Sequence, residues 1–238
     1  MHGLIVVDKP VNWTSMDVVR RVRRSARDGM RAAGQEIKRV KCGHAGTLDP
    51  LATGVLVCGL GKATKLMGTV MGQTKRYVAG VSLDGFTPTD DAEGLDQLQR
   101  VTVDAPPTRT ELDAALLTLT GDIQQTPPAY SAVHVDGRRA YQRVRAGEDV
   151  ELEPRPVRVD RIDVLSYAFP HLELDITCGK GTYIRSLARD LGKSLNTGGY
   201  LTSLRRTAVG DFTLDEAFPI EHFETPLRAA DLIPIAAD

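Results

Sequence analysis

The residue best placed to do chemistry is Asp49, which lies in a glycine-rich segment at residues 43–54 and directly precedes Pro50. Proline disfavours the helical region for the residue before it, so we expect Asp49 on an extended loop. The apolar run at residues 55–58 then predicts a short buried strand. A carboxylate held on a stiff loop beside a buried strand is a common way to present a reactive group. Asp-Pro near glycine is also an ordinary turn, and the spacing alone favours that interpretation.

Basic residues are distributed unevenly along a chain whose charge is nearly balanced. The 238 residues include 30 Lys and Arg against 31 Asp and Glu, and the sequence pI is about 6.5. This balance does not by itself indicate a nucleic-acid-binding protein. Nine basic residues nevertheless lie between Arg20 and Lys41, where Asp28 and Glu36 are the only acids. A protein with one basic face is therefore possible.

Composition and spacing exclude several classes of protein. Three scattered cysteines, Cys42, Cys58 and Cys178, are too few for a disulfide framework and lack zinc-ligand spacing, so we expect small buried hydrophobes. The apolar start at residues 4–7 is too short for a signal sequence, and no run approaches membrane-spanning length. We expect a soluble, cytoplasmic protein without a membrane segment.

Hydrophobic periodicity divides the chain into strands and helices. Val18, Val19 and Val22 recur at helical spacing with arginines on the other face, which predicts an amphipathic helix. Residues 108–119 predict another helix, in which Glu111 completes a capping box. Further helices are expected over residues 62–71, 138–146 and 183–195, and strands over residues 3–7, 76–83, 154–164, 172–178 and 201–209.

Three segments are expected to lack regular structure. Residues 27–39 are interpreted as a polar linker, residues 84–99 as an acidic surface excursion, and residues 124–130 as an extended segment because of their two prolines. Strands and helices alternate without βαβ regularity, which predicts a mixed α+β class.

A set of motifs follows in order between residues 3 and 218. They are VDKP at residues 7–10 with TS at 14–15, GHAGTLDPLATG at 43–54, KRY at 75–77, QTPPAYSA at 125–132 with GRRAY at 137–141, CGKGTYIR at 178–185, and LRRT at 204–207. In this order they resemble the motifs of the TruB family, the tRNA pseudouridine-55 synthases.

The resemblance implies a pseudouridine synthase catalytic fold, with a curved, mainly antiparallel mixed sheet, flanking helices and a deep RNA-binding cleft. We expect one catalytic domain over residues 1–238, with a short extension at residues 219–238 and no C-terminal PUA domain. The family isomerises uridine in the tRNA T-loop by cutting its N-glycosidic bond, turning the base and rejoining it through carbon. The resemblance also implies no metal or organic cofactor, the T-arm of tRNA as partner, no obligatory protein partner, and a monomer.

The resemblance assigns three residues to catalysis. Asp49 stands at the position of the nucleophile. Arg185 stands at that of its ion-pair partner, which would keep the carboxylate ionised and oriented. Tyr77 would stack on the uracil, where base–aromatic stacking contributes about 1–3 kcal/mol per base, and is a candidate for proton transfer.

Three further residues are expected to bind the everted nucleotide. His44 would occupy space beside the flipped base, and Tyr183 and Leu204 would complete the pocket. Each has an ordinary alternative interpretation. A histidine in a glycine loop is often a local hydrogen-bonding residue, and a leucine in a strand belongs to the core by default.

Arginines in two regions are expected to contact RNA phosphates, which would provide affinity and orientation. For any single arginine, a solvated surface role is an equally good interpretation. The expected phosphate-binding residues are Arg20, Arg24, Arg138, Arg139 and Arg143.

The chain departs from the family pattern in several places. Ala45 stands where threonine or serine is usual, Pro88 replaces an aspartate, and His134 replaces a lysine. Asn12 and Met16 depart from the first motif, and the segment at residues 27–39 is longer than usual. None of these changes touches the expected nucleophile, so we expect them to alter affinity more than chemistry.

Two alternatives to the leading function remain open. The same chemistry could act on another RNA, or the chain could be an RNA-binding or RNA-folding protein that has lost catalysis. Retention of Asp49, Tyr77, Tyr183 and Arg185 argues against the second alternative.

Overall fold

The chain divides into two units, each formed by its own set of contacts. The computed structural model describes residues 1–35, 39–131, 133–135, 137–148, 150 and 152–235. The first unit comprises Met1–Arg76 and Arg205–Asp238, and the second comprises Tyr77–Leu204.

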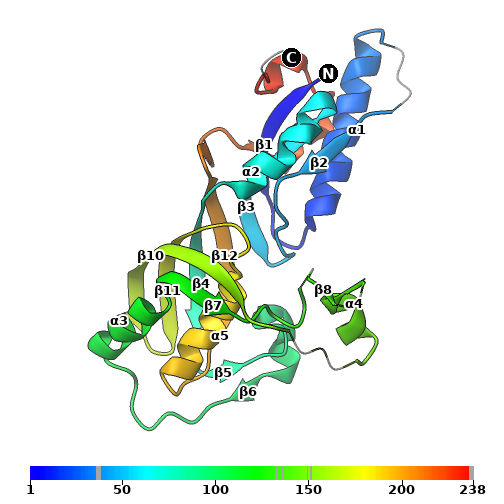
Figure 1. Cartoon of the computed structure of the whole chain (residues 1–238). Helices are drawn as coiled ribbons and strands as arrows, with labels where there is room; N and C mark the ends of the chain where they lie inside the picture. The colour runs from blue at the N-terminus through cyan, green and yellow to red at the C-terminus, as the bar shows by residue number, and fades with distance from the viewer. Residues whose placement is uncertain (36–38, 132, 136, 149, 151, 236–238) are drawn as a thin grey trace. The chain divides into compact units, whose positions relative to one another are not determined.

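The first unit contains the N-terminal strands, the longest helix and the C-terminal segment (Figure 1). Its elements are β1 (Gly3–Lys9), α1 (Ser15–Ala32), β2 (Cys42–His44), β3 (Ala52–Leu60), η1 (Gly61–Leu66), α2 (Met67–Gly72), β13 (Phe212–Thr213), β14 (Phe218–Pro219), η3 (Ile220–Glu224) and η4 (Ala229–Asp231).

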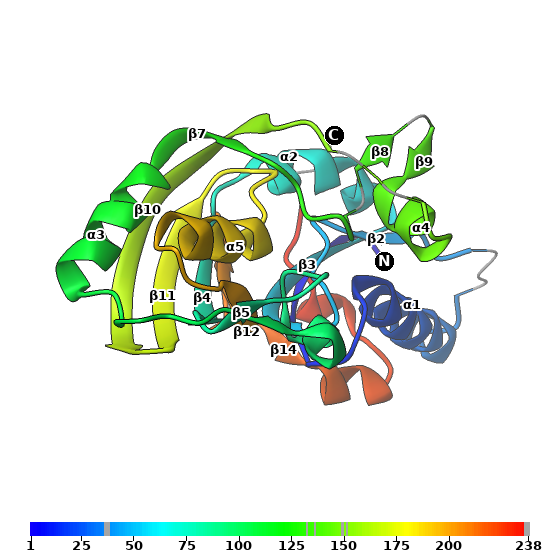
Figure 2. The same ribbon diagram turned by 90° about the horizontal axis from the view of Figure 1, so that it is seen from below.

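The amphipathic helix predicted around Val18 is confirmed as α1. Thr14 caps its N-terminus in a capping box with Asp17, an arrangement that satisfies backbone groups left open at the helix start. Val18, Val19 and Val22 are buried in one apolar cluster with residues of β1 and β3. The C-terminal helix η3 packs against α1, as Figure 2 shows in orange beside blue.

The second unit contains most of the remaining strands and helices. Its elements are β5 (Gly85–Phe86), η2 (Ala92–Gln97), β6 (Gln99–Arg100), α3 (Arg109–Thr118), β7 (Gly121–Gln125), β8 (His134–Val135), β9 (Arg138–Arg139), α4 (Ala140–Arg145), β10 (Arg155–Ala168), β11 (His171–Cys178) and α5 (Ile184–Ser194). Two strands, β4 (Lys75–Ser82) and β12 (Tyr200–Val209), contain residues of both units.

Hydrogen bonding links ten strands into one mixed sheet, and the α+β class is confirmed. The order is β14-β1-β3-β12-β4-β11-β10-β7, with β2 on β3 and β13 on β12. Strand β3 is antiparallel to β1, strand β14 is parallel to β1, and β10 is antiparallel to both β11 and β7. Within this sheet β2 places His44 opposite Cys58.

Several predicted boundaries are wrong. Helix α1 continues to Ala32, so residues 27–32 are not part of a linker. Arginine is a good helix former, and the helix contains no glycine beyond Gly29. Residues 61–66 form a 3-10 helix before α2, and Arg138 and Arg139 lie in a strand before α4. The predicted helix α3 and its capping box are confirmed.

The cysteines agree with the expectation of small hydrophobes in two cases. Cys58 and Cys178 are buried, whereas Cys42 is partly exposed. Burial raises the pKa of Cys42 to about 12, so its thiol stays protonated at neutral pH.

None of the helices described here has the length and apolar character needed to span a bilayer. Similarly, the described residues include no group of three His, Cys, Asp or Glu able to hold a metal ion.

Candidate active site

Asp49 lies half-buried on a loop of the first unit, and the residues beside it are anchored to the start of α1. The Ser15 hydroxyl accepts a hydrogen bond from the Leu48 amide at 2.8 Å and donates one to the Leu48 carbonyl at 3.1 Å. On the other side, the Asn12 amide donates to the Pro50 carbonyl at 2.8 Å. The backbone is therefore held immediately before and after the carboxylate.

A buried lysine adds a third attachment to this loop. Lys9 is fully buried, and its ammonium donates to the carbonyls of Trp13 at 2.6 Å, Pro10 at 3.0 Å and Pro50 at 3.4 Å. A buried charge needs polar partners of this kind to offset its desolvation. Lys9 thus joins the end of β1, the turn before α1 and the Asp49 loop.

Arg206 holds the two ends of the same loop. Its side chain is 1% exposed and donates to the carbonyls of Val55 at 2.7 Å and Gly46 at 3.2 Å. Gly54 lies against the Arg206 backbone with φ of 99°, and a Cβ at this position would lie 2.2 Å from the Arg206 carbonyl oxygen. Only glycine combines this φ with so close an approach.

His44 lies in the same unit as Asp49, at the end of β2. Burial lowers the pKa of His44 below its usual value, and the nearby positive charge of Arg206 lowers this pKa further. The imidazole is therefore neutral at pH 7. Its Nδ1 atom is buried and has no hydrogen-bond partner among the residues that the structure describes.

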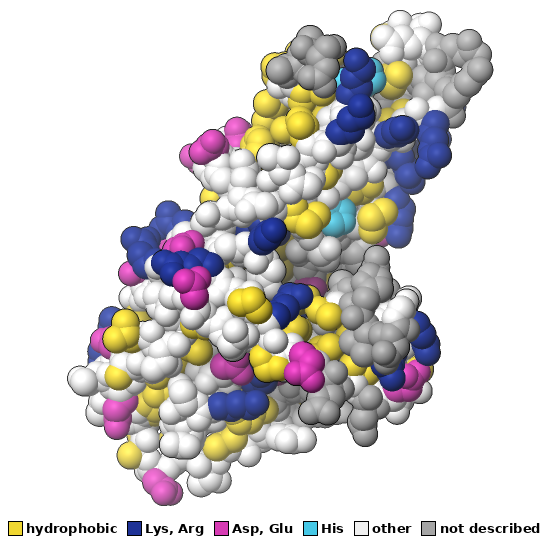
Figure 3. Space-filling view, in the orientation of Figure 1, with side chains coloured by type: hydrophobic (Ala, Val, Ile, Leu, Met, Phe, Trp, Pro, Cys, Tyr) yellow, Lys and Arg dark blue, Asp and Glu magenta, His cyan; other side chains and the backbone are white. Residues whose placement is uncertain are grey.

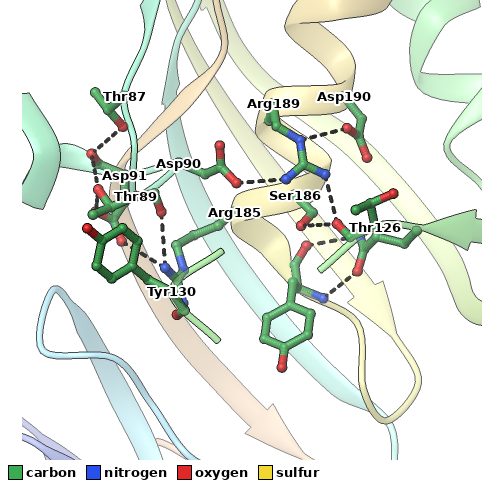
Figure 4. Close-up of polar contacts among 12 residues, drawn as sticks. Thr87, Thr89, Asp90, Asp91, Thr126, Tyr130, Arg185, Ser186, Arg189 and Asp190 are labelled. Carbon is green, nitrogen blue, oxygen red and sulfur yellow. Dashed lines mark hydrogen bonds and ion pairs between the residues drawn. The ribbon is translucent and has the colours of Figure 1, made fainter. Parts of the chain in front are cut away.

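In the second unit, Arg185 is buried at the start of α5 and is not a surface arginine (Figure 4). Its guanidinium lies 3.6 Å from the Asp91 carboxylate. It also donates to the carbonyls of Thr89 at 3.0 Å and Tyr130 at 3.1 Å. These contacts fix the planar guanidinium between two loops of the unit.

A second ion pair lies one helical turn along α5. Arg189 donates to Asp90 at 2.8 Å and to the Thr126 carbonyl at 2.8 Å, and it also contacts Asp190 at 3.0 Å (Figure 4). Burial raises the pKa of Asp90 above 3.8, although attraction to Arg189 and Arg185 opposes the shift. Two consecutive aspartates thus bind two arginines on one face of α5, as their four-residue spacing allows.

These contacts correct one interpretation made from the sequence. Residues 84–99 were expected to form a surface excursion, but Asp90 and Asp91 are 7% and 1% exposed. The acids are buried because α5 supplies their counter-charges. Thr87 and Thr89 fix the turn further through hydrogen bonds to Asp91, whereas Pro88 between them is exposed.

Tyr183 directly precedes α5 and is held by a buried amide. The Gln125 side chain accepts from the Tyr183 amide at 2.8 Å and donates to the Tyr183 carbonyl at 3.0 Å. The Arg155 guanidinium lies 4.9 Å from the centre of the Tyr183 ring. Tyr77 and Leu204 are both buried and belong to the neighbouring strands β4 and β12.

The arginines expected to bind RNA are placed on surfaces of both units. Arg138 and Arg143 share one acid, Glu148, at 3.0 Å and 2.7 Å. The side chain of Arg139 lies outside the described part of the chain, as does that of His134. Arg20 and Arg24 are exposed on α1. Ala45, at the position where a hydroxyl was expected, is fully buried.

The six predicted catalytic and pocket residues are thus divided between the units. Asp49 and His44 lie in the first unit, and Tyr77, Tyr183, Arg185 and Leu204 lie in the second. Pairing of Asp49 with Arg185 stays a prediction.

Sequence reasoning missed the residues that support the site. Ser15 and Arg206 appeared only as members of the motifs at residues 14–15 and 204–207, and neither was assigned a role. The four-residue spacing of Arg185 and Arg189 was a usable signal, because it places both guanidinium groups on one face of a helix. No local pattern indicated that Asp90 and Asp91 would be their partners.

Comparison with solved structures defines the class of protein. The chain is similar to a chain in a crystal structure of a Cbf5-Nop10-Gar1 complex, with a TM-score of 0.67 and 28% identity over 92% of this chain and 52% of that chain. A structure of an H/ACA RNP bound to a substrate RNA containing 2'-deoxyuridine gives a TM-score of 0.63 at 26% identity, covering 92% of this chain and 51% of that one. The present chain therefore spans about half of each solved chain. Its fold is that of the pseudouridine synthases.

Sequence comparison gives the family. The TruB family pseudouridylate synthase N-terminal domain matches residues 34–184, and the tRNA pseudouridylate synthase B C-terminal domain matches residues 185–231. A tRNA pseudouridine synthase B of Arthrobacter sp. is 49% identical over 98% of this chain and 74% of that protein. That of Thermobifida fusca is 49% identical over 99% of this chain and 78% of that protein. The chain belongs to the TruB family of pseudouridylate synthases.

Proposed function

We propose that this chain isomerises uridine to pseudouridine in tRNA, at position 55 of the T-loop, with Asp49 as the nucleophile. Relatives that match nearly its whole length are tRNA pseudouridine synthases, which supports the reaction and the substrate class. The observation that carries the choice of nucleophile is the anchoring of the Asp49 loop. Ser15, Asn12 and Arg206 hold the backbone around this one carboxylate.

The target uridine must leave its stack before a side chain can reach it. Enzymes that act on a base inside structured nucleic acid extrude the nucleotide into a pocket, and this step costs a few kcal/mol. We assign the pocket to Tyr77, Tyr183 and Leu204, with His44 beside the everted base. Stacking of the base on Tyr77 would contribute about 1–3 kcal/mol and so offset part of the free energy needed for extrusion.

Asp49 then attacks the everted nucleoside in its ionised form. The N-glycosidic bond breaks, the uracil turns, and a carbon–carbon bond joins C5 of the ring to the sugar as Asp49 is released. C5 then loses its proton and N1 gains one, so the product is an isomer of the substrate. We assign to Arg185 the role of keeping Asp49 ionised and oriented. The contacts of Arg185 with Asp91, Thr89 and Tyr130 support this role, because they hold its guanidinium in one orientation.

Mapping of pseudouridine by nucleotide in an unmodified tRNA transcript tests the proposal. We expect a single product at the T-loop uridine, and Asp49→Asn should abolish turnover while RNA binding persists. Product at another nucleotide would support the same chemistry on a different target. Folded wild-type protein that binds the transcript and gives no product would support an RNA-binding protein without catalysis. Turnover by Asp49→Asn at a rate near that of wild type would refute the assignment of the nucleophile.

The remaining expectations follow from this function. We propose that residues 1–238 act as one catalytic domain on the T-arm, as a monomer and without an obligatory protein partner. Because tRNA is the substrate, the proposal places the protein in the cytoplasm.

A further inference from the structure

Helix α1 carries a stripe of exposed arginines that the proposed reaction does not use. Arg20, Arg24, Arg27 and Arg31 follow one another at spacings of three and four residues, so their side chains lie on one face of the helix. These side chains are 62%, 74%, 48% and 64% exposed. Figure 3 shows dark-blue side chains gathered along the edge where α1 lies in Figure 1.

This stripe concentrates positive charge at an energetic cost. The whole chain has a net charge of −1, whereas α1 contains six arginines and only two aspartates, Asp17 and Asp28. Like charges four residues apart, such as Arg20 and Arg24, destabilise a helix. On a helix face that contacts only water, alternating positive and negative side chains would avoid this repulsion.

Arg20 pairs with Asp17 at 2.6 Å, whereas the other three arginines of the stripe have a weaker shared partner and are available to a stronger anion. Asp28 lies 3.8–3.9 Å from Arg24, Arg27 and Arg31, so three guanidinium groups share a single carboxylate. Exposed ion pairs of this kind contribute little to stability, because water and salt screen them. Exchanging them for contacts with a phosphate would therefore cost little.

The stripe lines two hollows in the surface, and the first includes a residue that is hydrogen-bonded to the Asp49 loop. One hollow is lined by Asn12, Trp13, Asp17, Arg20, Arg21 and Arg24. The next is lined by Arg20, Arg23, Arg24, Arg27, Arg31, Arg39 and Val40. The two hollows share Arg20 and Arg24, and Asn12 at the near end donates to Pro50, the residue after Asp49.

We propose that this arginine groove is a phosphate-binding track for the RNA strand that flanks the modified uridine. Ser15 touches the Asp49 loop, and a helix rises about 1.5 Å per residue, so the stripe runs from about 8 Å to about 24 Å beyond that contact. A strand whose nucleotide is everted at Asp49 has its neighbouring phosphates within this range. The inference rests on the proposed function, because it takes Asp49 as the point where the RNA is engaged.

Salt-dependent binding of an unmodified tRNA transcript tests the track. The variant Arg24→Gln/Arg27→Gln/Arg31→Gln removes three charges and keeps good helix formers. The matched control is Arg100→Gln/Arg109→Gln/Arg161→Gln, in which three exposed arginines, each 2.7–2.8 Å from an acid, are removed from the second unit. Thermal unfolding should show that both variants are folded.

We expect the slope of log K against log salt concentration to become shallower by about 2–3 in the α1 variant, since each lost phosphate contact removes about 0.7–0.9. Affinity at low salt should fall by about tenfold or more, and the loss should appear in binding rather than in the single-turnover rate at saturating RNA. The control should retain the wild-type slope. With T-arm hairpins of decreasing stem length, the difference between wild type and the α1 variant should shrink.

Two results would overturn the track: a wild-type slope in the α1 variant, or an equal loss in the control. If wild type makes pseudouridine and the α1 variant keeps the wild-type slope, the track fails and the proposed function stands. If wild type makes no pseudouridine but its binding still depends on these arginines, the proposed function fails and the link of the track to a modified uridine fails with it, while the stripe is supported as a phosphate-binding surface.

Discussion

Replacement of Ser15 by alanine is a sharp test of how the Asp49 loop is held. The Ser15 hydroxyl is buried and bonds both the amide and the carbonyl of Leu48, the residue immediately before Asp49. Ser15 is the first residue of α1, whereas the side-chain cap is provided by Thr14. Ser15→Ala therefore removes the loop contact and leaves the helix cap in place.

The expected loss of stability can be estimated from these contacts. A buried amide deprived of its hydrogen-bond partner costs about 1–3 kcal/mol. Alanine recovers a few tenths of this, about 0.5 kcal/mol, through its higher helix propensity. The free energy of unfolding should therefore fall by about 0.5–2.5 kcal/mol. A shift of the catalytic group of about 1 Å can reduce the rate about 100-fold, so we expect a single-turnover rate about 10–100-fold below that of wild type.

Thr14→Ala is the matched control. It removes the N-cap of the same helix, which costs about 1 kcal/mol, and Thr14 bonds Asp17 rather than the loop. Urea denaturation should give similar losses for Ser15→Ala and Thr14→Ala. Single-turnover assays at saturating tRNA should then separate them, with only Ser15→Ala slowed. Equal rates for the two variants would show that Ser15 does not position the nucleophile.

Two further predictions concern single positions in the two units. Gly54→Ala places a methyl group 2.2 Å from the Arg206 carbonyl at φ of 99° and should lower the free energy of unfolding by at least about 2 kcal/mol. Gly68→Ala, whose Cβ would meet no atom within 4 Å, should be neutral or stabilising in the same thermal unfolding assay. Burial raises the pKa of Asp90 above 3.8, so the native state binds this proton more tightly than the unfolded state. Stability should therefore fall as pH rises from 3.8 through the raised value. Asp90→Asn should remove that dependence in urea titrations at several pH values; an unchanged profile would contradict the assignment. The side-chain oxygen of the introduced asparagine can still accept the hydrogen bond that Arg189 donates to Asp90.

Much of the fold could be predicted from local patterns. The spacing of Val18, Val19 and Val22 identified α1, because a helix face must be apolar to pack against a sheet. Thr108 and Glu111 identified the start of α3, because both partners of a capping box lie within four residues. The ordered motifs identified the family, and with it the candidate nucleophile. Each of these signals lies within a short stretch of chain.

The predictions that failed depended on the rest of the molecule. Residues 27–32 looked like part of a polar linker because two arginines, an aspartate and a glycine interrupt the apolar spacing there. Ala26 and the preceding valines nevertheless pack the helix onto its neighbours, and the helix continues to Ala32. Asp90 and Asp91 looked like surface acids because their partners, Arg189 and Arg185, lie more than ninety residues away.

The sequence by itself determined which residue types are present for the reaction, above all a carboxylate on a glycine-rich loop and an arginine at the start of a helix. Only the tertiary structure decided what holds them. Ser15 reaches Leu48 across 33 residues, and Arg206 reaches Val55 across 151 residues. The physical reason is that a hydrogen bond or ion pair depends on distance in space, and folding brings together groups whose separation along the chain carries no local signal.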